Sequence, residues 1–207
     1  MLGELERTEM TRLWERKLRQ DSQGVPQAER HRNVEPVSAE FICSLAAGMG
    51  AKRILEIGGS SGLSTIALAA AARQVSGKVT SIEKEPLRQA ESRQTLTHLG
   101  LACYVDFILG DAASVVGTLG EFDFVFIDCE KEDYTRFFDL VQVGAGGIVV
   151  ADNVISHSLT EYVAHVGSQP GVESITLPIG KGLEVTRFRL PSRQEPCGHA
   201  ESTSHEA

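Results

Sequence analysis

Oxygen-bearing side chains follow two apolar runs in the second half of the sequence. Asp128 ends the run 124–127, and Asp152 and Asn153 follow the run 148–151. Carboxylate and amide oxygens are hard donors, which suit Mg²⁺, Mn²⁺ or Ca²⁺ better than zinc. If the two runs are neighbouring strands, these side chains meet at one edge of a sheet and predict a divalent metal site. The simpler alternative is that Asp152 and Asn153 only form an Asx turn.

A loop of small residues follows an earlier apolar run. Residues 53–64, Arg-Ile-Leu-Glu-Ile-Gly-Gly-Ser-Ser-Gly-Leu-Ser, indicate a buried strand that turns sharply into a helix. Glycines let the backbone approach a ligand, and amides at a helix N-terminus attract a carboxylate or phosphate. Glu83 ends the next apolar run, about 20 residues after the loop, where an acid can accept hydrogen bonds from ribose hydroxyls. Together they predict an adenosine-like ligand.

The elements that must position these residues follow an alternating pattern. After helices at 2–20 and 36–50 and a polar loop at 21–35, strands alternate with helices. The expected strands are 53–57, 78–83, 103–109, 122–127 and 146–151, and the expected helices are 62–74, 85–99, 111–118, 132–142 and 157–168. Two β-rich runs, 172–178 and 183–190, are joined by Ile-Gly-Lys-Gly, which predicts an antiparallel hairpin. The pattern predicts an α/β fold with a mainly parallel seven-stranded sheet, a C-terminal antiparallel hairpin and helices on both faces.

Ligands of open α/β sheets bind outside the carboxyl ends of the strands. Acidic residues stand at several of these predicted ends and are expected to line one crevice. They are Glu56, Glu83, Asp111, Asp128 and Asp152.

Five short motifs occur in a fixed order along the chain. They are Glu56-Ile-Gly-Gly-Ser-Ser-Gly62, Ser81-Ile-Glu83, Gly110-Asp-Ala112, Phe126-Ile-Asp-Cys-Glu-Lys131 and Gly146-Gly followed by Ala151-Asp-Asn-Val154. With them, residues 34–190 resemble the S-adenosylmethionine-dependent O-methyltransferases of the catechol and caffeoyl-coenzyme-A type. The resemblance implies a Rossmann-like class I methyltransferase fold.

The resemblance also implies roles for single residues. S-adenosylmethionine would be bound by Val34, Glu56, Gly58, Gly59, Ser64, Glu83, Asp111, Ala112 and Asp128. Asp128, Asp152 and Asn153 would hold Mg²⁺ (or Mn²⁺ or Ca²⁺), which in the family also holds two oxygens of the acceptor. Lys131 matches the family's general base, since a lysine beside a divalent cation loses its proton more readily. The alternative for Lys131 is a solvated lysine at a helix start, where a cation is slightly unfavourable. His157 is explained equally well by a polar residue near a helix start.

Composition limits the class of protein. The 207 residues suit one domain, with 42% hydrophobic and 23% charged residues. We expect residues 1–35 to form a helix and an acceptor-side loop, 36–190 the methyltransferase domain and 191–207 a disordered tail. Neither a membrane-spanning run nor a secretory signal is visible, and the four cysteines form no Cys-x-x-Cys pair. These features predict a protein of the reducing cytoplasm.

Charge separates the functional alternatives. The net charge of −8 argues against broad binding of nucleic acid. The resemblance implies a small hydroxylated, catechol-like acceptor. Residues 1–35 are balanced, however, so a tRNA wobble hydroxyuridine methyltransferase would be favoured by an exposed arginine face on residues 7–32. A cofactor-binding protein without catalysis is opposed by the complete metal and base set. A dinucleotide oxidoreductase fits less well, because Ser60 interrupts the Gly-x-Gly-x-x-Gly pattern.

We also expect a homodimer. The amphipathic segment 2–20, with Trp14 and Leu18, has no evident place in the core of the sheet. Such a helix can bury its apolar face against a partner surface.

Overall fold

The computed structural model describes residues 2–26 and 29–190, so the predicted tail 191–207 lies outside the described residues. The helices are α1 (Glu4–Ser22), α2 (Pro36–Gly48), α3 (Leu63–Val75), α4 (Pro86–His98), α5 (Ala112–Val115), α6 (Tyr134–Leu140) and α7 (Thr160–Gly167). The strands are β1 (Arg53–Ile57), β2 (Lys78–Glu83), β3 (Val105–Leu109), β4 (Glu121–Ile127), β5 (Gln142–Ala151), β6 (Val172–Leu177) and β7 (Leu183–Phe188). Short 3₁₀ turns are η1 (Ala102–Tyr104), η2 (Val116–Thr118) and η3 (Lys131–Asp133).

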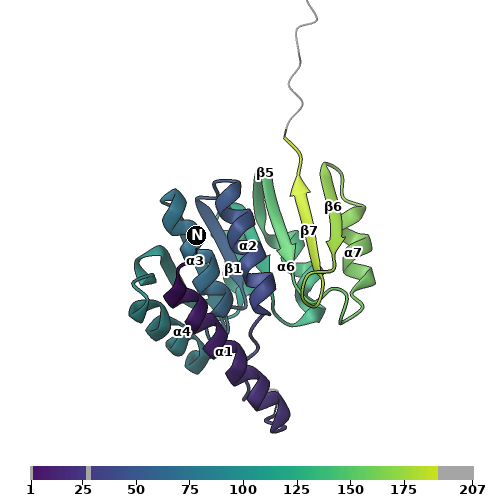
Figure 1. Ribbon diagram of the computed structural model, residues 1–207. Helices are drawn as coiled ribbons and strands as arrows, with labels where there is room; N and C mark the ends of the chain where they lie inside the picture. The colour runs from purple at the N-terminus through teal and green to yellow at the C-terminus, as the bar shows by residue number, and fades with distance from the viewer. Residues whose placement is uncertain (1, 27–28, 191–207) are drawn as a thin grey trace, which may run out of the picture.

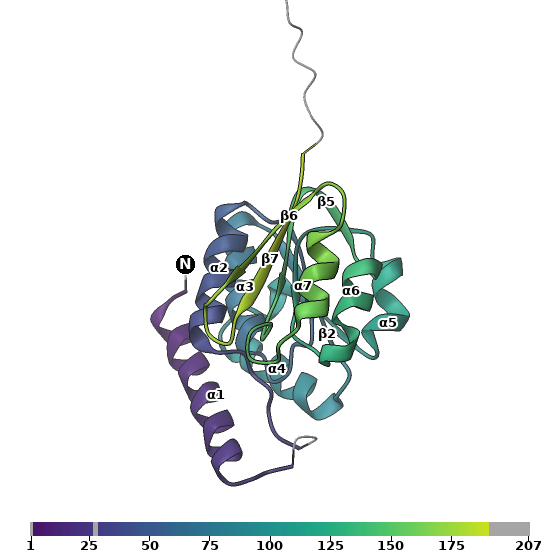
Figure 2. The same ribbon diagram turned by 90° about the vertical axis from the view of Figure 1, so that its right-hand side faces the viewer.

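The strands form one seven-stranded sheet in the order β3-β2-β1-β4-β5-β7-β6. β1 to β5 pair in parallel, whereas β7 pairs antiparallel with both β5 and β6. Helices cover both faces, and the hairpin β6–β7 lies at one side of the molecule (Figures 1 and 2). The predicted fold class is therefore confirmed. In Figure 1, β5 points downward and β7 upward, so the carboxyl ends of the parallel strands lie toward the lower end of the sheet.

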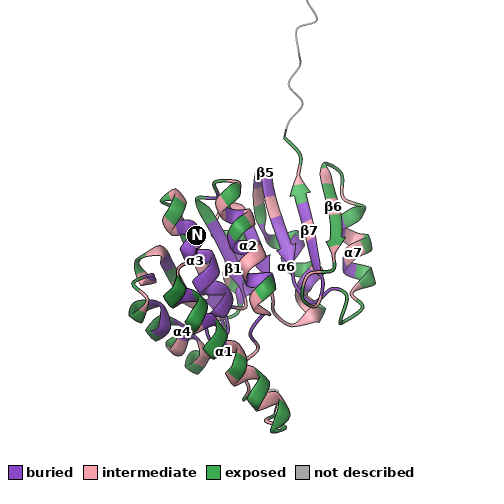
Figure 3. Ribbon diagram, viewed as in Figure 1, coloured by how far each residue is buried: buried purple, intermediate pink, exposed green. Residues whose placement is uncertain are grey.

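Helix α3 shows why the glycine loop is held so firmly. It runs between the sheet and helices α1 and α2, and Ala67 and residues 69–72 have no exposed surface. Alanine side chains allow helices and strands to approach closely from several sides at once. The helix is buried along nearly its whole length in Figure 3, so its N-terminus gives the preceding loop a rigid support.

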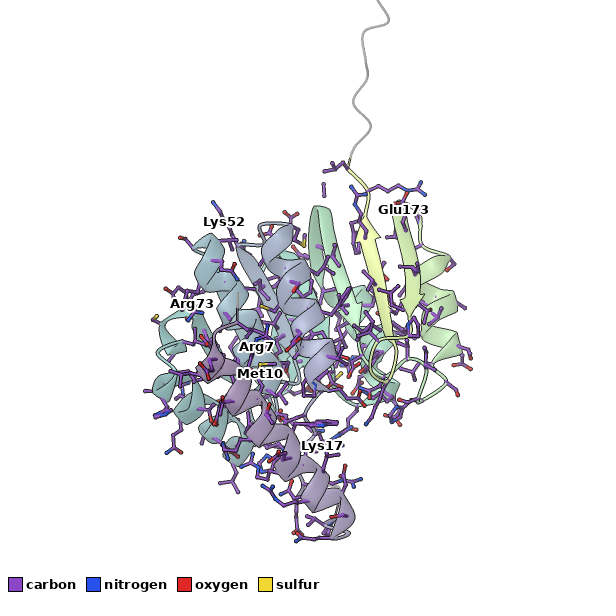
Figure 4. All side chains as sticks on the ribbon, viewed as in Figure 1. Arg7, Met10, Lys17, Lys52, Arg73 and Glu173 are labelled. Carbon is purple, nitrogen blue, oxygen red and sulfur yellow. The ribbon has the colours of Figure 1, made fainter. Side chains whose placement is uncertain are left out.

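Helix α1 packs within its own chain. Met10 is 2% exposed and Leu13 is fully buried in the cluster formed with α2 and α3. Glu6, also buried, forms an ion pair of 2.8 Å with Arg73 on α3, and Figure 4 labels Met10 and Arg73 on these two helices. The expectation that this helix lacks a place in the core was therefore wrong. The homodimer stays a prediction without that argument.

Two elements near the end of the chain differ from the expected bounds. β5 begins at Gln142 rather than 146, with an irregular register opposite β4, and α7 begins at Thr160 rather than 157. The segment before α7 is instead tied to the β6–β7 turn, because the Val154 amide donates to the Gly182 carbonyl at 3.0 Å. This long-range hydrogen bond holds residues after Asn153 in a turn.

None of the helices in residues 2–26 and 29–190 combines the length and the apolar character needed to cross a membrane.

Candidate functional site

A cleft opens at the carboxyl ends of β1, β2 and β4. The predicted cofactor residues that line it are Gly58, Glu83, Asp111, Ala112 and Asp128. The structure thus brings five of the nine predicted cofactor residues to one cleft.

The glycine loop and the acid of β2 are joined directly. The Ser60 amide donates to Glu83 Oε2 at 2.7 Å, and the Glu85 amide donates to Glu83 Oε1 at 3.0 Å. Gly58 has a φ of +95°, and a Cβ there would collide with the Asp128 carbonyl oxygen. Only glycine fits this position without a shift of the backbone. The carboxylate of Glu83 is therefore held at the cleft by the backbone.

Three other predicted cofactor residues lie in the loop or directly beneath it. Glu56 is fully buried, and its Oε2 accepts hydrogen bonds from Thr65 Oγ1 at 2.6 Å and Ser81 Oγ at 2.5 Å. Burial raises the pKa of Glu56 despite these hydrogen bonds. A Cβ at Gly59 would lie 2.5 Å from Ser81 Oγ, and Ser64 is 5% exposed on the first turn of α3. Glu56 therefore does not line the crevice, contrary to the expectation, because it turns beneath the loop to reach these hydroxyls. Contact of these three residues with a cofactor stays a prediction.

A strap of residues 30–34 crosses the glycine loop. The Arg32 amide donates to Ser60 Oγ at 3.1 Å, and Ser61 Oγ donates to Asn33 Oδ1 at 3.0 Å. Arg32 also forms an ion pair of 2.5 Å with Glu130 beyond β4. Val34, the last predicted cofactor residue, has its side chain in the core. Sequence reasoning missed Arg32, since the polar loop around it carries no motif.

The predicted metal ligands lie together at the ends of β4 and β5. Asn153 Nδ2 donates to Asp128 Oδ1 at 3.0 Å and to Asp152 Oδ2 at 2.8 Å. Asn153 has a φ of +65°, a conformation that asparagine tolerates better than most residues. The amide thus bridges two carboxylates that would otherwise repel each other.

This cluster has the character of a cation site. Asp152 is 2% exposed, and its Oδ1 has no hydrogen-bond partner among the described residues. Burial and the nearby charge of Asp128 raise the pKa of Asp152 to about 8. A divalent cation would compensate both carboxylates, and an amide can turn to present its oxygen, so the residues fit Mg²⁺. Residues 2–26 and 29–190 hold no metal-binding group of three or more His, Cys, Asp or Glu side chains, so Asn153 would be the third ligand.

Lys131 is fixed beside this cluster. Its Nζ lies 3.1 Å from Asp128 Oδ1 and 2.6 Å from the Tyr134 hydroxyl oxygen. That hydroxyl in turn donates to the Asp152 carbonyl at 3.1 Å. Tyr134 is fully buried, and burial followed by the charge of Asp128 raises its pKa, so it stays a neutral phenol. Lys131 is therefore oriented by a carboxylate and a phenol, which is not expected for a solvated surface lysine.

A second cavity, of about 200 Å³, adjoins the cleft. It shares Arg32 and Asp128 with the first and is also lined by Lys131 and Asn153. Its remaining walls come from α1, the strap and the β6–β7 turn, including Lys17, Asp21, Arg30 and Lys181. Sequence reasoning placed none of these four residues in the site. The Ile-Gly-Lys-Gly turn was recognised only as a hairpin connection, although its lysine was visible.

His157 lies at the rim of the second cavity. It is exposed, and its Nδ1 shares a hydrogen bond of 2.9 Å with Ser156 Oγ. Partial burial and the charges of Lys131 and Lys181 lower the pKa of His157. A neutral rim residue agrees with the modest role expected from the sequence.

The two cavities meet at Asp128, beside Lys131. An arrangement of this kind can hold two small molecules end to end and move a proton at their junction.

Comparisons with known proteins agree with this arrangement. The family model described as O-methyltransferase matches residues 12–187. Catechol O-methyltransferase of Mycobacterium tuberculosis is 36% identical over 126 residues, which cover 59% of this chain and 57% of that protein. Caffeoyl-CoA O-methyltransferase 2 of Petunia hybrida is 26% identical over 189 residues, which cover 75% of this chain and 77% of that protein. The cofactor-bound structure of Rv0187 from MTB superposes with a TM-score of 0.74 at 27% identity, covering 86% of this chain and 90% of that one. The resemblance inferred from the motifs is confirmed, and the chain belongs to the O-methyltransferase family.

Proposed function

We propose that this protein transfers the methyl group of S-adenosylmethionine to a hydroxyl of a catechol-like small molecule, with the help of a divalent cation. The observation that carries the proposal is the meeting of two cavities at Asp128, which also holds Lys131 at 3.1 Å. The names of the relatives, catechol and caffeoyl-CoA O-methyltransferase, support the substrate class.

The first cleft is proposed to bind the cofactor. Glu83 presents two oxygens that are already oriented by the amides of Ser60 and Glu85, and they suit a pair of ribose hydroxyls. Asp111 and Ala112, at the start of α5, would flank the adenine ring, and Phe137 adds an apolar wall that the sequence did not suggest. When bound, S-adenosylmethionine supplies a methyl group on a positively charged sulfur.

Asp128, Asp152 and Asn153 would hold the cation. Bound there, Mg²⁺ would make an acceptor hydroxyl more acidic and would fix its orientation. The buried, unpartnered oxygen of Asp152 is the feature of the chain that calls for such a positive charge.

Lys131 is proposed to take the proton from the acceptor hydroxyl. Its Nζ is held at one place by Asp128 and Tyr134, so no side-chain rotation is needed before proton transfer. The buried phenol of Tyr134 stays protonated and serves to orient the amine rather than to accept a proton.

The tRNA alternative is not favoured. It required an exposed arginine face on residues 7–32, but each described arginine there faces a carboxylate. The pairs are Arg7–Glu40, Arg12–Glu9, Arg16–Glu91, Arg19–Glu15, Arg30–Asp21 and Arg32–Glu130. Arginines neutralised in this way contribute little to binding of a phosphate backbone.

The test is an assay of labelled methyl transfer from S-adenosylmethionine to a panel of catechols and to tRNA, with Mg²⁺ and after exhaustive chelation. We expect methylated catechols only when the cation is present. Full turnover in EDTA would remove the metal from the proposal, and methylation of tRNA alone would overturn the substrate class.

We also propose a homodimer, because β6 is an edge strand of the sheet and its Ile175 is 58% exposed, so a second copy could pair along this edge. Light scattering at micromolar concentration would decide it, since a monomer has a mass of 22.4 kDa.

A further inference from the structure

The β6–β7 turn places a lysine in the second cavity. Lys181 lies between Gly180 and Gly182, which have φ values of +56° and +95°. The turn closes on itself, because the Gly182 amide donates to the Ile179 carbonyl at 2.9 Å. The glycines allow a tight turn that aims the lysine at the cavity rather than along the strand.

The backbone of this turn is tied to the proposed metal site. The amides of Val154 and Ser156 donate to the carbonyls of Gly182 and Lys181, each at 3.0 Å. These donors follow Asp152 and Asn153 directly in the chain. Lys181 is therefore held in a defined position relative to the proposed metal ligands, although it lies on a different element.

Lys181 forms no salt bridge with a carboxylate of residues 2–26 and 29–190. Its charge acts on the carboxyl of Asp152 and partly offsets the rise in the pKa of that group, but its ammonium group has no carboxylate in direct contact. Lys131, in the same cavity, is by contrast engaged by Asp128. Lys181 is partly buried and lines the second cavity, so its ammonium group is available to a ligand there.

The wall contributed by α1 and the strap adds further positive charge. Lys17 and Arg30 share a single carboxylate, that of Asp21, at 2.6 Å and 2.9 Å. The whole chain carries a net charge of −8, so an excess of cations in one cavity is a local feature. The lining of the second cavity has five lysines or arginines against two aspartates, and such an excess of positive charge in a concave site attracts anionic ligands.

We propose that the acceptor carries an anionic group, a carboxylate or a phosphate, and that Lys181 pairs with it. The inference rests on the proposed function, because it assigns the substrate class of the same site. The hydroxyl that is methylated would lie at Asp128 and Lys131, and the anionic group would lie toward the β6–β7 turn. Lys181 thereby determines specificity without touching the reacting atoms.

The test compares an acid with its neutral ester. The acceptors are 3,4-dihydroxybenzoate and its methyl ester, assayed with the wild type, Lys181→Met, Lys181→Glu and the control Lys52→Met. Lys52 lies at the opposite, upper edge of the molecule in Figure 4, so its substitution makes the same change in net charge away from the site. We expect Lys181→Met to lower kcat/KM for the acid by about tenfold, through a higher KM, and to leave kcat/KM for the ester nearly unchanged. The control Lys52→Met should behave like the wild type with both acceptors. Lys181→Glu should lower kcat/KM further for the acid only.

Two results would overturn the inference. One is an equal loss for acid and ester in Lys181→Met, which would mean that the lysine only supports the turn. The other is a wild-type enzyme that uses the ester as well as the acid. Benzoate and phenyl phosphate, tested as competitive inhibitors, then distinguish a carboxylate from a phosphate. The inhibitor that binds the wild type more tightly than Lys181→Met carries the group that Lys181 recognises.

Failure of the proposed function is distinguishable from failure of this inference. If neither catechol is methylated, calorimetric binding of 3,4-dihydroxybenzoate to the wild type and to Lys181→Met still measures the pairing. Tighter binding to the wild type by about tenfold supports the anionic subsite, and equal binding rejects it.

Discussion

The two cavities are built in different ways. The cofactor cleft is formed by the ends of neighbouring parallel strands, where backbone amides hold the side chain of Glu83 in place. The second cavity is closed by side chains from α1, the strap and the β6–β7 turn, which are far apart in the sequence. The cleft thus depends on the geometry of the sheet, and the second cavity depends on how remote segments dock onto it. Because different residues form each cavity, we expect a substitution in one cavity to leave ligand binding in the other nearly unchanged.

We expect Asp152→Ala to produce the largest difference between the effect on turnover and the effect on cofactor binding. Its loss removes a proposed cation ligand at the junction but none of the residues that line the cofactor cleft. Turnover should fall on the order of 10⁴-fold, equivalent to several kcal/mol of transition-state stabilisation, while S-adenosylmethionine binding changes little. Turnover assays and calorimetry check both halves, with Asp106→Ala on exposed β3 as the control. A large loss of cofactor affinity would show that the cavities are not independent at this residue.

Lys131→Ala should reduce turnover on the order of 10²–10⁴-fold, the range for removal of a general base. Raising the pH should partly rescue the variant, because the acceptor hydroxyl then ionises without help. The pH–rate profile is the measurement, and Lys78→Ala, a lysine beyond the site, is the matched control. If the variant and the wild type have parallel profiles, Lys131 does not act as the base.

Glu83→Ala should have the opposite pattern to Asp152→Ala. The substitution removes the carboxylate that would accept hydrogen bonds from the ribose hydroxyls. Each hydrogen bond to a charged group contributes about 1.5–3 kcal/mol to binding of the cofactor. Calorimetry should therefore show weaker binding of S-adenosylmethionine by at least tenfold. Glu173→Ala, an exposed glutamate on β6 that Figure 4 labels near the upper edge, should bind like the wild type. Wild-type affinity in Glu83→Ala would refute the ribose assignment.

The smallest effect is expected from Glu6→Gln, which weakens the docking of α1 on α3. Burial opposes ionisation of Glu6, but hydrogen bonds from the backbone and Arg73 outweigh it and lower its pKa from the ordinary value of 4.5. Because the folded-state pKa is lowered, the ion pair stabilises the fold above pH 4.5 and loses this contribution as the pH falls through the folded-state pKa.

Urea denaturation at pH 7 should show a loss of about 1 kcal/mol in Glu6→Gln. The difference from the wild type should shrink as the pH falls through the lowered folded-state pKa of Glu6. Since α1 contributes a wall of the second cavity, KM for the acceptor should rise while cofactor affinity stays constant. An unchanged stability at pH 7 would mean that the pair with Arg73 does not hold the helix.

Much of the fold and of the cofactor cleft could be predicted from local patterns. Strand periodicity placed Glu83, Asp128 and Asp152 at carboxyl ends, and parallel pairing brings such ends to one edge of a sheet. The motifs added Lys131, and the structure places it beside Asp128 as expected. Local patterns also located the hairpin, because two β-rich runs joined by Gly-Lys-Gly leave few other connections.

Only the tertiary structure decided the depth of Glu56 and the composition of the second cavity. A strand-end acid can face the cleft or turn beneath the loop, and the hydroxyls of Thr65 and Ser81 hold Glu56 in the second position. Lys181 and Arg30 come together with Asp128 through docking of a turn and a strap, each fixed by long-range hydrogen bonds. Such contacts carry no periodic signal, because they join residues whose distance along the chain is unrelated to their distance in space.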